Sequence, residues 1–140
     1  NLIEVEEIYS KAITTSLGAN TNNIVVDSEI SAKEAISYLK NNNLGRATFF
    51  PLSIIKEKQI NEQDKYILNE PGCIDIASNL VKYDKTYKNI IKNQLGNIIV
   101  VDNIDTTNKI SKKIRAISPK TTNVPQLYPC FCKIKNSQMR

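Results

Sequence analysis

Asn1-Leu2-Ile3-Glu4-Val5-Glu6-Glu7-Ile8-Tyr9 opens the chain and returns 78 residues later as Asn79-Leu80-Val81-Lys82-Tyr83-Asp84-Lys85-Thr86-Tyr87. Both copies continue through Leu-Gly, at Leu17-Gly18 and Leu95-Gly96, into an apolar run that ends in Asp27 or Asp102. After the glycine the offset falls to 75, because the first copy carries three extra residues between Gly18 and Asn22. A period this long exceeds the common solenoid repeats and indicates a duplicated half-domain. We therefore predict a mixed α/β (α+β) fold of two similar subdomains, each with a small sheet flanked by helices.

The composition is that of an ordinary globular chain. Its 140 residues are 41% hydrophobic and 24% charged. No apolar run approaches the roughly 18 residues of a membrane helix, and Glu4, Glu6 and Glu7 have the wrong sign for a signal peptide. Three cysteines, with no C-x-x-C spacing and no histidine, favour neither a disulfide framework nor a zinc site. We expect a soluble, intracellular protein without membrane contact, and we interpret the chain as a fragment of something longer because it begins inside the first copy.

The charge is unevenly distributed. Residues 1–105 hold 11 Lys and Arg against all 14 Asp and Glu, whereas residues 106–140 hold eight basic residues and no acidic one. A polyanion is the obvious partner for such an end, and a simply solvated basic surface is the alternative. The candidate DNA-binding residues are Lys109, Lys112, Lys113 and Arg115, joined by Lys82, Lys85 and Lys88.

The first copy predicts helix, strand, helix and strand. A stripe from Val5 through Ile8 to Leu17 has helical spacing and is closed by Gly18 in a left-handed cap. Ile24–Val26 has the pattern of a short buried strand. Ser31 with Glu34 forms an S-x-x-E capping box for a helix that ends within residues 41–43. Its predicted inner face consists of Ala32, Ala35, Ile36 and Leu39, and residues 44–52 then form a strand closed by Pro51.

A polar connector, residues 53–71, separates the copies and is expected to hold a short helix or edge strand near residues 66–68. Glu70-Pro71-Gly72 is a turn, and residues 73–77 alternate like a half-buried strand. The strand equivalent to residues 73–77 in the first copy would lie before Asn1.

The second copy repeats the plan. Its helix stripe runs from Tyr83 to Leu95, Gly96 is the cap, and Ile98–Val101 is the strand. Asp105 or Thr106 is expected to cap a further helix, which carries Ile110 and Ile114 on its inner face. After Ile117 the parallel with the first copy is predicted to fail, and residues 126–134 are at best a short edge strand.

The search for catalytic chemistry is negative. The four glycines lie too far apart for G-x-G-x-x-G or a P-loop, and without histidine no Ser-His or Cys-His nucleophile can be written. Asp27 and Asp102 follow strands and are interpreted as turn or capping residues. Cys130 and Cys132 are interpreted as packing residues. We therefore predict no enzyme activity, no cofactor and no metal in this chain.

Several separated blocks, in order, give the sequence a resemblance to the hinge domain of SMC (structural maintenance of chromosomes) proteins, in the bacterial form. The blocks are Asn-Leu-Ile-x-Val with Tyr-x-x-Ala-Ile and Leu-Gly, then Leu44-Gly45-Arg46-Ala47-Thr48-Phe49, Ala77-Ser78-Asn79-Leu80-Val81-Lys82-Tyr83-Asp84 and Leu95-Gly96-Asn97-Ile98-Ile99-Val100-Val101-Asp102. The resemblance covers residues 1–117. It departs at Gly72-Cys73-Ile74-Asp75, where the family has Gly-x-x-Gly, and after Ile117, where the family's Thr-Leu-Asp-Gly and Gly-Gly segments are missing.

The resemblance implies a dimerisation domain at the tip of an antiparallel coiled coil. Residues 1–70 would be subdomain one with the connector, and residues 71–140 subdomain two. Subdomain one of each hinge would meet subdomain two of its partner, closing a homodimeric ring for chromosome condensation and segregation, with weak, non-specific DNA contact. The coiled-coil arms and the ATPase heads would lie outside this chain. The expected interface residues are Gly72, Cys73, Ile74, Asp75, Ile76, Gln126, Leu127 and Tyr128.

Two other classes of function remain open at this stage. An autonomous basic nucleic-acid-binding domain is weakened because the basic end offers only Tyr128 and Phe131 for stacking. An enzyme is weakened by the missing acid and base groups.

Overall fold

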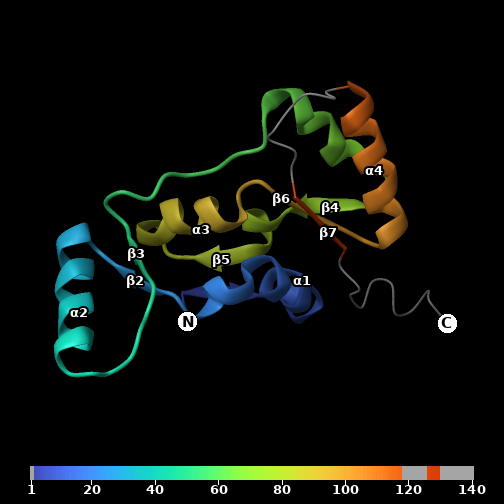
Figure 1. The fold of residues 1–140 in the computed structure, drawn as a ribbon. Coiled ribbons are helices and arrows are strands. Elements are labelled where there is room, and N and C mark those ends of the chain that lie inside the picture. The colour runs from blue at the N-terminus through green and yellow to red at the C-terminus, as the bar shows by residue number, and fades with distance from the viewer. Residues whose placement is uncertain (1, 118–125, 130–140) are drawn as a thin grey trace.

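The computed structural model describes the backbone of residues 2–117 and 126–129, and the side chains as far as Ile114 (Figure 1). We call residues 2–52 the first half, and residues 73–117 with 126–129 the second half. The helices are α1 (Glu7–Leu17), α2 (Glu29–Asn41), α3 (Lys88–Leu95) and α4 (Ile104–Ile117), with short 3₁₀ segments η1 (Gly18–Asn22), η2 (Glu62–Asn69), η3 (Ala77–Leu80) and η4 (Lys85–Tyr87). The strands are β1 (Ile3–Val5), β2 (Ile24–Val26), β3 (Phe49–Pro51), β4 (Cys73–Ile76), β5 (Val81–Tyr83), β6 (Ile98–Val101) and β7 (Gln126–Pro129). They form three small sheets, β1-β5, β2-β3 and β4-β6-β7, so the predicted mixed fold class is confirmed.

The two copies of the opening segment pair with each other. β1 and β5 are antiparallel, with Ile3 opposite Tyr83, Glu4 opposite Lys82 and Val5 opposite Val81. Because the two copies are offset by 78 residues, Glu4 and Lys82 are equivalent positions, and they lie opposite each other. The pairing therefore has a local twofold axis between Glu4 and Lys82. The prediction that Val5 and Tyr83 begin helix stripes was wrong, because an apolar-polar-apolar triplet also fits a strand and each copy supplies the other's ladder partners.

The other two sheets share one pattern. β2 and β3 are parallel with Val26 opposite Pro51, and β6 and β7 are parallel with Val101 opposite Pro129. β7 therefore stands in the second half where β3 stands in the first, so the prediction that the parallel fails after Ile117 was wrong. Of the predicted strand at residues 126–134, residues 130–134 lie outside the described part.

The strand predicted at residues 44–52 is reduced to Phe49–Pro51. Asn43 and Gly45 have positive φ, 53° and 90°, which turn the chain after α2 instead of letting it extend. Leu52 N donates to Val26 O (2.8 Å), continuing the β2 contact beyond Pro51, which has no N–H to donate.

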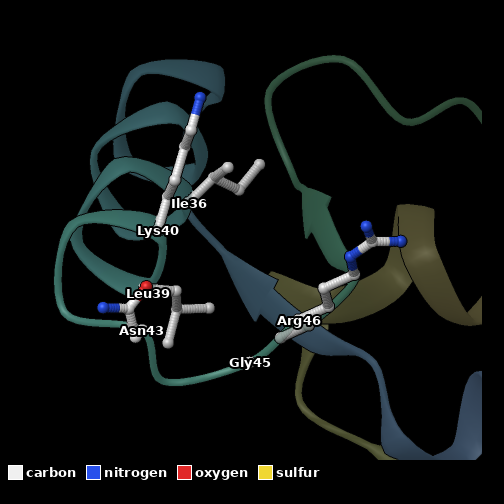
Figure 2. Close-up of a pocket in the computed structure, with 7 residues that line it drawn as sticks. Ile36, Leu39, Lys40, Asn43, Gly45 and Arg46 are labelled. Atoms are coloured by element: carbon white, nitrogen blue, oxygen red, sulfur yellow. The ribbon is translucent and has the colours of Figure 1, made fainter.

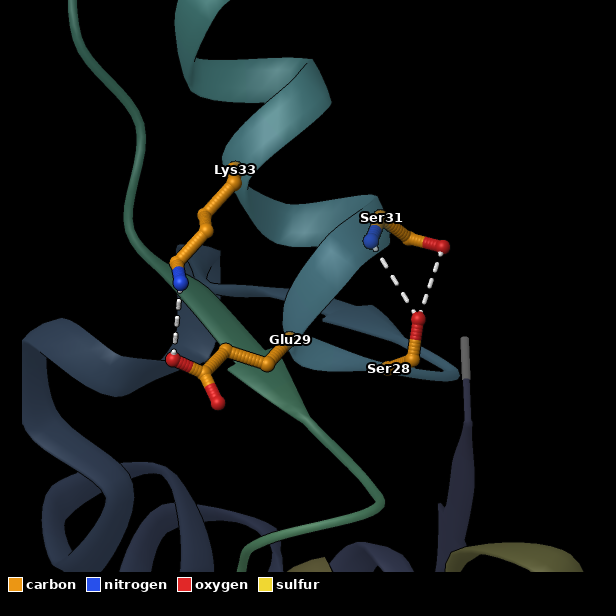
Figure 3. Close-up of polar contacts among 4 residues, drawn as sticks. All are labelled: Ser28, Glu29, Ser31 and Lys33. Atoms are coloured by element: carbon orange, nitrogen blue, oxygen red, sulfur yellow. Dashed lines mark hydrogen bonds and ion pairs between the residues drawn. The ribbon is translucent and has the colours of Figure 1, made fainter.

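The helices that follow β2 and β6 begin in the same way. Ser28 Oγ accepts a hydrogen bond from Ser31 N (3.2 Å), as Figure 3 shows, and Asn103 Oδ1 accepts one from Thr106 N (2.9 Å). The predicted caps at Ser31 and at Asp105 or Thr106 were therefore placed two or three residues too late. The hydroxyls of Ser31 and Thr106 instead lie within hydrogen-bond distance of the cap side chains of Ser28 and Asn103. Figure 3 also shows the Glu29–Lys33 ion pair (3.3 Å) in the first turns of α2.

Asp27 and Asp102 lie in the turns between strand and helix, as predicted, next to the cap residues Ser28 and Asn103. Thr106 Oγ1 donates to Asp102 Oδ1 (2.6 Å), and at the equivalent place the hydrogen bond from the Ser31 hydroxyl is the main cause that lowers the pKa of Asp27. In each half, a hydroxyl four residues further along the chain donates to the aspartate that follows β2 or β6.

The larger core is shared by both halves. It contains α1 residues, α3 residues and the inner side of β6, and its buried members are Ala12, Ile13, Ala77, Val81, Ile90, Ile91, Leu95, Ile98 and Val100. A second core lies between α4, β6 and η2, and its buried members are Ile60, Ile67, Ile99, Val101, Ile110 and Ile114. Every residue of β6 is buried, whereas Ile24 of β2 is 45% exposed and Ile36 of α2 is 50% exposed. The predictions of a buried β2 and an inward Ile36 were wrong: within the described residues β2 pairs with β3 alone, whereas β6 lies between two strands, and Ile36 lines an open cavity beside α2.

Gly18 ends α1 with a positive φ of 54°, as expected, but its ψ of −132° is not that of the predicted left-handed cap. Gly96 at the end of α3 has an ordinary φ of −74°, so its predicted role as a cap does not explain why the residue is glycine. A Cβ at Gly96 would collide with the carbonyl oxygens of Lys58 and Lys92. Glycine is needed there because the connector, with Lys58 N donating to Lys92 O (3.3 Å), lies directly against the helix end.

Candidate dimer and nucleic-acid interfaces

The first candidate interface is β4, an edge of the three-stranded sheet. Within the described residues it pairs with β6 alone, in antiparallel register. The predicted turn precedes it: Cys73 N donates to Glu70 O (3.1 Å) and Gly72 has a φ of 90°. A Cβ at Gly72 would also meet Asp102 Oδ1 at 2.7 Å, and Asp102 N donates to Gly72 O (2.8 Å). The turn is therefore tied to the start of α4.

A bulge at Ile74 interrupts the β4 ladder, since Cys73 pairs with Val101 but Asp75 pairs with Val100. Ile74 packs against the shared core, while Cys73 and Ile76 pack against the second core. The carboxylate of Asp75 accepts from Ile76 N (2.6 Å) and from Asn79 Nδ2 (3.0 Å). The side chains of β4 are all half-buried in the single chain, so a partner would meet mainly its backbone edge.

The second candidate, Gln126 to Tyr128, lies in β7 at the opposite edge of the same sheet. The structure thus places the two predicted interface segments on one sheet, with β6 between them, and does not join them into one surface. Each offers a separate edge to which a strand could add.

Burial raises the pKa of the Cys73 thiol to about 11, with further contributions from the negative charges of Asp75, Asp102 and Glu70. The thiol is therefore protonated at neutral pH, and the site does not activate it as a nucleophile.

The candidate DNA-binding residues fall into two groups. Lys109, Lys112 and Lys113 are exposed on α4, and Arg115 is in the same helix with its side chain outside the described part. Lys113 Nζ lies 2.6 Å from Glu70 Oε1, so one of these cations is already paired.

Lys82, Lys85 and Lys88 lie on β5, η4 and the start of α3 and are also exposed. Lys88 Nζ is 3.6 Å from Glu57 Oε1. α4 and α3 lie at different ends of the second half (Figure 1), so the structure does not combine the two groups into one basic patch. The α4 group is the more compact candidate.

A cavity of about 640 Å³ lies between α2 and the segment that follows it, and sequence reasoning missed it. Figure 2 shows Lys40 and Arg46 extending beside it from opposite walls. Its lining residues are Ile36, Leu39, Lys40, Asn43, Gly45, Arg46 and Ala47. Ile36 was predicted to lie on an inner face but is exposed. Once the backbone is known, this mismatch points to the cavity.

Over residues 2–117 and 126–129, no group of three His, Cys, Asp or Glu side chains is placed to hold a metal ion. In the same part of the chain, no helix has both the length and the apolar character needed to cross a membrane.

Comparison with known proteins gives one consistent family. The family described as SMC proteins Flexible Hinge Domain matches residues 1–111. The chromosome partition protein Smc of Bacillus subtilis is 38% identical over 112 residues, which are 79% of this chain and 9% of that protein. Smc of Mesomycoplasma hyorhinis is 40% identical over 112 residues, 79% of this chain and 11% of that protein. The chain therefore spans about a tenth of the length of these relatives.

Solved structures agree. An asymmetric dimer of the Geobacillus stearothermophilus SMC hinge domain matches with a TM-score of 0.78 and 42% identity, over 81% of this chain and 47% of that one. The Pyrococcus furiosus SMC hinge domain matches with a TM-score of 0.66 and 34% identity, over 77% of this chain and 55% of that one. From its sequence blocks, its fold and these relatives, the chain belongs to the SMC flexible hinge domain family.

Proposed function

We propose that this chain is the dimerisation hinge of a chromosome-organising SMC ATPase, and that it joins two coiled-coil arms in chromosome condensation and segregation. Support comes from the family, from relatives that are chromosome partition proteins, and from a hinge relative that forms a dimer. In this proposal the ATPase heads belong to other parts of a longer protein, the hinge itself does no catalysis, and the location is cytoplasmic at the nucleoid.

The observation that carries the proposal is that, among residues 2–117 and 126–129, both outer edges of the β4-β6-β7 sheet have no strand partner. Unpaired backbone groups on an edge strand favour the addition of a partner strand. A homodimer in which subdomain one, residues 1–70, meets subdomain two, residues 71–140, makes two equivalent contacts and closes on itself. The edge residues are Gly72, Cys73, Ile74, Asp75 and Ile76 with Gln126, Leu127 and Tyr128.

Weak, sequence-independent DNA contact is an accessory part of the proposal. Lys109 and Lys112 are exposed and have no acidic partner within 4 Å among the described residues, so they are available to phosphate oxygens. An autonomous nucleic-acid-binding domain would need a larger combined surface than the two separated lysine groups provide.

Hydrogen exchange followed by mass spectrometry or NMR tests the dimer without any mutation. Raising the concentration from low to high micromolar should slow exchange in residues 73–76 or 126–129, while β1 and β5, paired within one chain, should not change. Sedimentation at the same concentrations should show the twofold mass. A monomer at high micromolar concentration with both halves protected would defeat the proposal for this chain.

A further inference from the structure

A second cavity, of about 190 Å³, lies where the connector meets the second half of the chain. The connector, η2 included, lines it on one side, and the end of β4, η3 and the C-terminal end of α3 complete the lining. Among the described residues that line it, three are lysines and none is an aspartate or a glutamate. None of these lysines belongs to the candidate DNA-binding groups. They are Lys58, Lys65 and Lys92.

The fold brings two of these lysines together through a backbone contact. Lys58 N donates to Lys92 O (3.3 Å), and Gly96 permits this approach because a Cβ there would collide with Lys58 O. Among the side chains that the structure describes, neither Lys58 nor Lys92 has a carboxylate within 4 Å. Lys65 does have one, since its Nζ lies 2.5 Å from Glu62 Oε1, but the Glu62 side chain is 84% exposed and an ion pair open to solvent is weak. Two uncompensated positive charges therefore line the cavity.

The same cavity contains a buried hydroxyl group. Ser78 of η3 lines it and is only 6% exposed, and within the described part of the chain its hydroxyl makes no hydrogen bond. The neighbouring Asn79 is already engaged, because its Nδ2 donates to Asp75 Oδ1 (3.0 Å). A buried hydroxyl without a hydrogen bond destabilises the folded chain unless water or a ligand pairs with it. A polar occupant is therefore expected in this cavity.

The hydrogen-bond donors decide which kind of occupant fits. An ammonium group can only donate hydrogen bonds, and a hydroxyl can donate one as well. The occupant therefore has to supply acceptors, and a negative charge strengthens each hydrogen bond that it accepts. Water would satisfy the Ser78 hydroxyl but would bring no negative charge beside Lys58 and Lys92. A compact anion with several oxygen atoms satisfies the hydroxyl and both ammonium groups together.

We propose that this cavity binds one small oxyanion of the phosphate class, whose oxygens accept hydrogen bonds from Lys58 Nζ, Lys92 Nζ and Ser78 Oγ. A free phosphate can turn all of its oxygens toward these donors, whereas a phosphate within DNA is joined to a sugar on each side. A free anion is therefore the better match for a recess of about 190 Å³. The three donors belong to the connector, α3 and η3, so the bound anion would hold the connector against the second half. The inference depends neither on dimerisation nor on the DNA contact proposed above.

Titration of the isotope-labelled chain with sodium phosphate near neutral pH, followed by NMR, tests the site. Sodium chloride is lowered in step, so that the ionic strength stays constant. The backbone amide signals of Lys58, Ser78 and Gly96 should shift with one common dissociation constant and saturate in the millimolar range, while the signals of α2 should not shift. Ser78→Ala removes one donor to a charged acceptor and should weaken binding about tenfold.

Lysine variants separate the cavity from the overall charge of the protein. Lys58→Gln combined with Lys92→Gln should abolish the saturable shifts. The matched control, Lys33→Gln combined with Lys40→Gln, removes the same charge from α2 and should leave the dissociation constant unchanged. Lys58 is exposed, so Lys58→Gln alone is the variant to use if the double variant does not fold, and it should weaken binding about tenfold.

Three results would overturn the proposal. The first is a set of shifts that rise linearly with phosphate and spread over lysines throughout the chain, because that pattern indicates non-specific screening and leaves only water in the cavity. The second is equal phosphate affinity in the Lys58 and Lys92 double variant and in the α2 control. The third is a short DNA duplex that shifts the signals of Lys58, Ser78 and Gly96 when phosphate does not, since the cavity would then belong to a nucleic-acid surface.

Discussion

Replacing Gly96 with alanine should destabilise the chain well beyond an ordinary glycine substitution. The backbone at Gly96 has helical φ, so alanine by itself would gain up to about 1 kcal/mol in helix propensity. The added Cβ, however, collides with the carbonyl oxygens of Lys58 and Lys92, both backbone atoms that cannot rotate away. Overpacking of this kind costs about 1–3 kcal/mol.

Relief of the collision requires the connector to move from the end of α3. That movement breaks the bond from Lys58 N to Lys92 O (3.3 Å) and the bond from Asn93 Nδ2 to Lys56 O (2.8 Å). Each contributes about 1 kcal/mol. After the propensity gain is subtracted, the expected loss in the free energy of unfolding is about 2–4 kcal/mol.

Urea denaturation followed by circular dichroism measures the loss. Gly45→Ala is the matched control, because Gly45 has a φ of 90° but nothing within 4 Å of a Cβ, so it reports backbone strain alone, about 1–2 kcal/mol. Exchange of the Lys58 amide separates the two causes, since it should rise in Gly96→Ala and stay unchanged in Gly45→Ala. A Gly96→Ala chain as stable as the natural one, with the Lys58 amide still protected, would refute the reasoning.

Three further predictions follow from the caps, the thiol and the lysines. Thr106→Val keeps the shape but removes the 2.6 Å hydrogen bond to Asp102, so unfolding in urea should show a loss of about 2 kcal/mol, and an unchanged midpoint would contradict this. Because the folded-state pKa of Cys73 is raised to about 11 from 9.0, its contribution to stability is complete below pH 9 and is lost as pH rises toward 11. Cys73→Ala should therefore flatten the fall in stability between pH 9 and 11, and parallel curves would argue against the burial of the thiol. DNA binding measured by fluorescence anisotropy should weaken steeply with salt and disappear on fourfold substitution by Glu, whereas Lys33→Glu with Lys40→Glu on α2 should leave it unchanged; salt-independent binding, or binding that survives the fourfold change, would remove DNA contact from the proposed function. The four substituted residues are Lys109, Lys112, Lys113 and Arg115.

The parts of the fold that could be predicted are those whose sequence pattern occurs in both copies of the repeat. Ile98–Val101 is β-branched and follows the same helix-Gly pattern as Ile24–Val26, so both strands were found. Cap positions were missed because Ser28 and Ser31 both carry hydroxyls, and only the backbone decides which one lies before the first turn. The role of Gly96 could not be predicted, since it depends on a connector residue 38 positions away in the chain.

The candidate interfaces were predicted as segments but not as surfaces. Residues 73–76 and 126–129 are strands, as the alternation and the prolines indicated, and each is a sheet edge within the part of the chain that the structure describes. That they flank the same strand, β6, depends on the topology of the sheet, and the spacing of residues along the sequence does not reveal it. Lys82 and Lys109 were likewise grouped in sequence because both are basic, but they lie on separate elements of the second half.

The antiparallel pairing of β1 with β5 favours the contact between these two strands over the contact of either strand with its own copy in another chain. On its axis, Glu4 faces Lys82, so opposite charges stand across the ladder. If β1 of one chain met β1 of another in the same register, two glutamates would oppose each other, and two β5 strands would oppose two lysines. Such like-charge pairs destabilise homotypic association. Because the two copies are covalently joined, this position is free to differ between them, and the duplicated chain distinguishes its own other half from an identical strand of a neighbour.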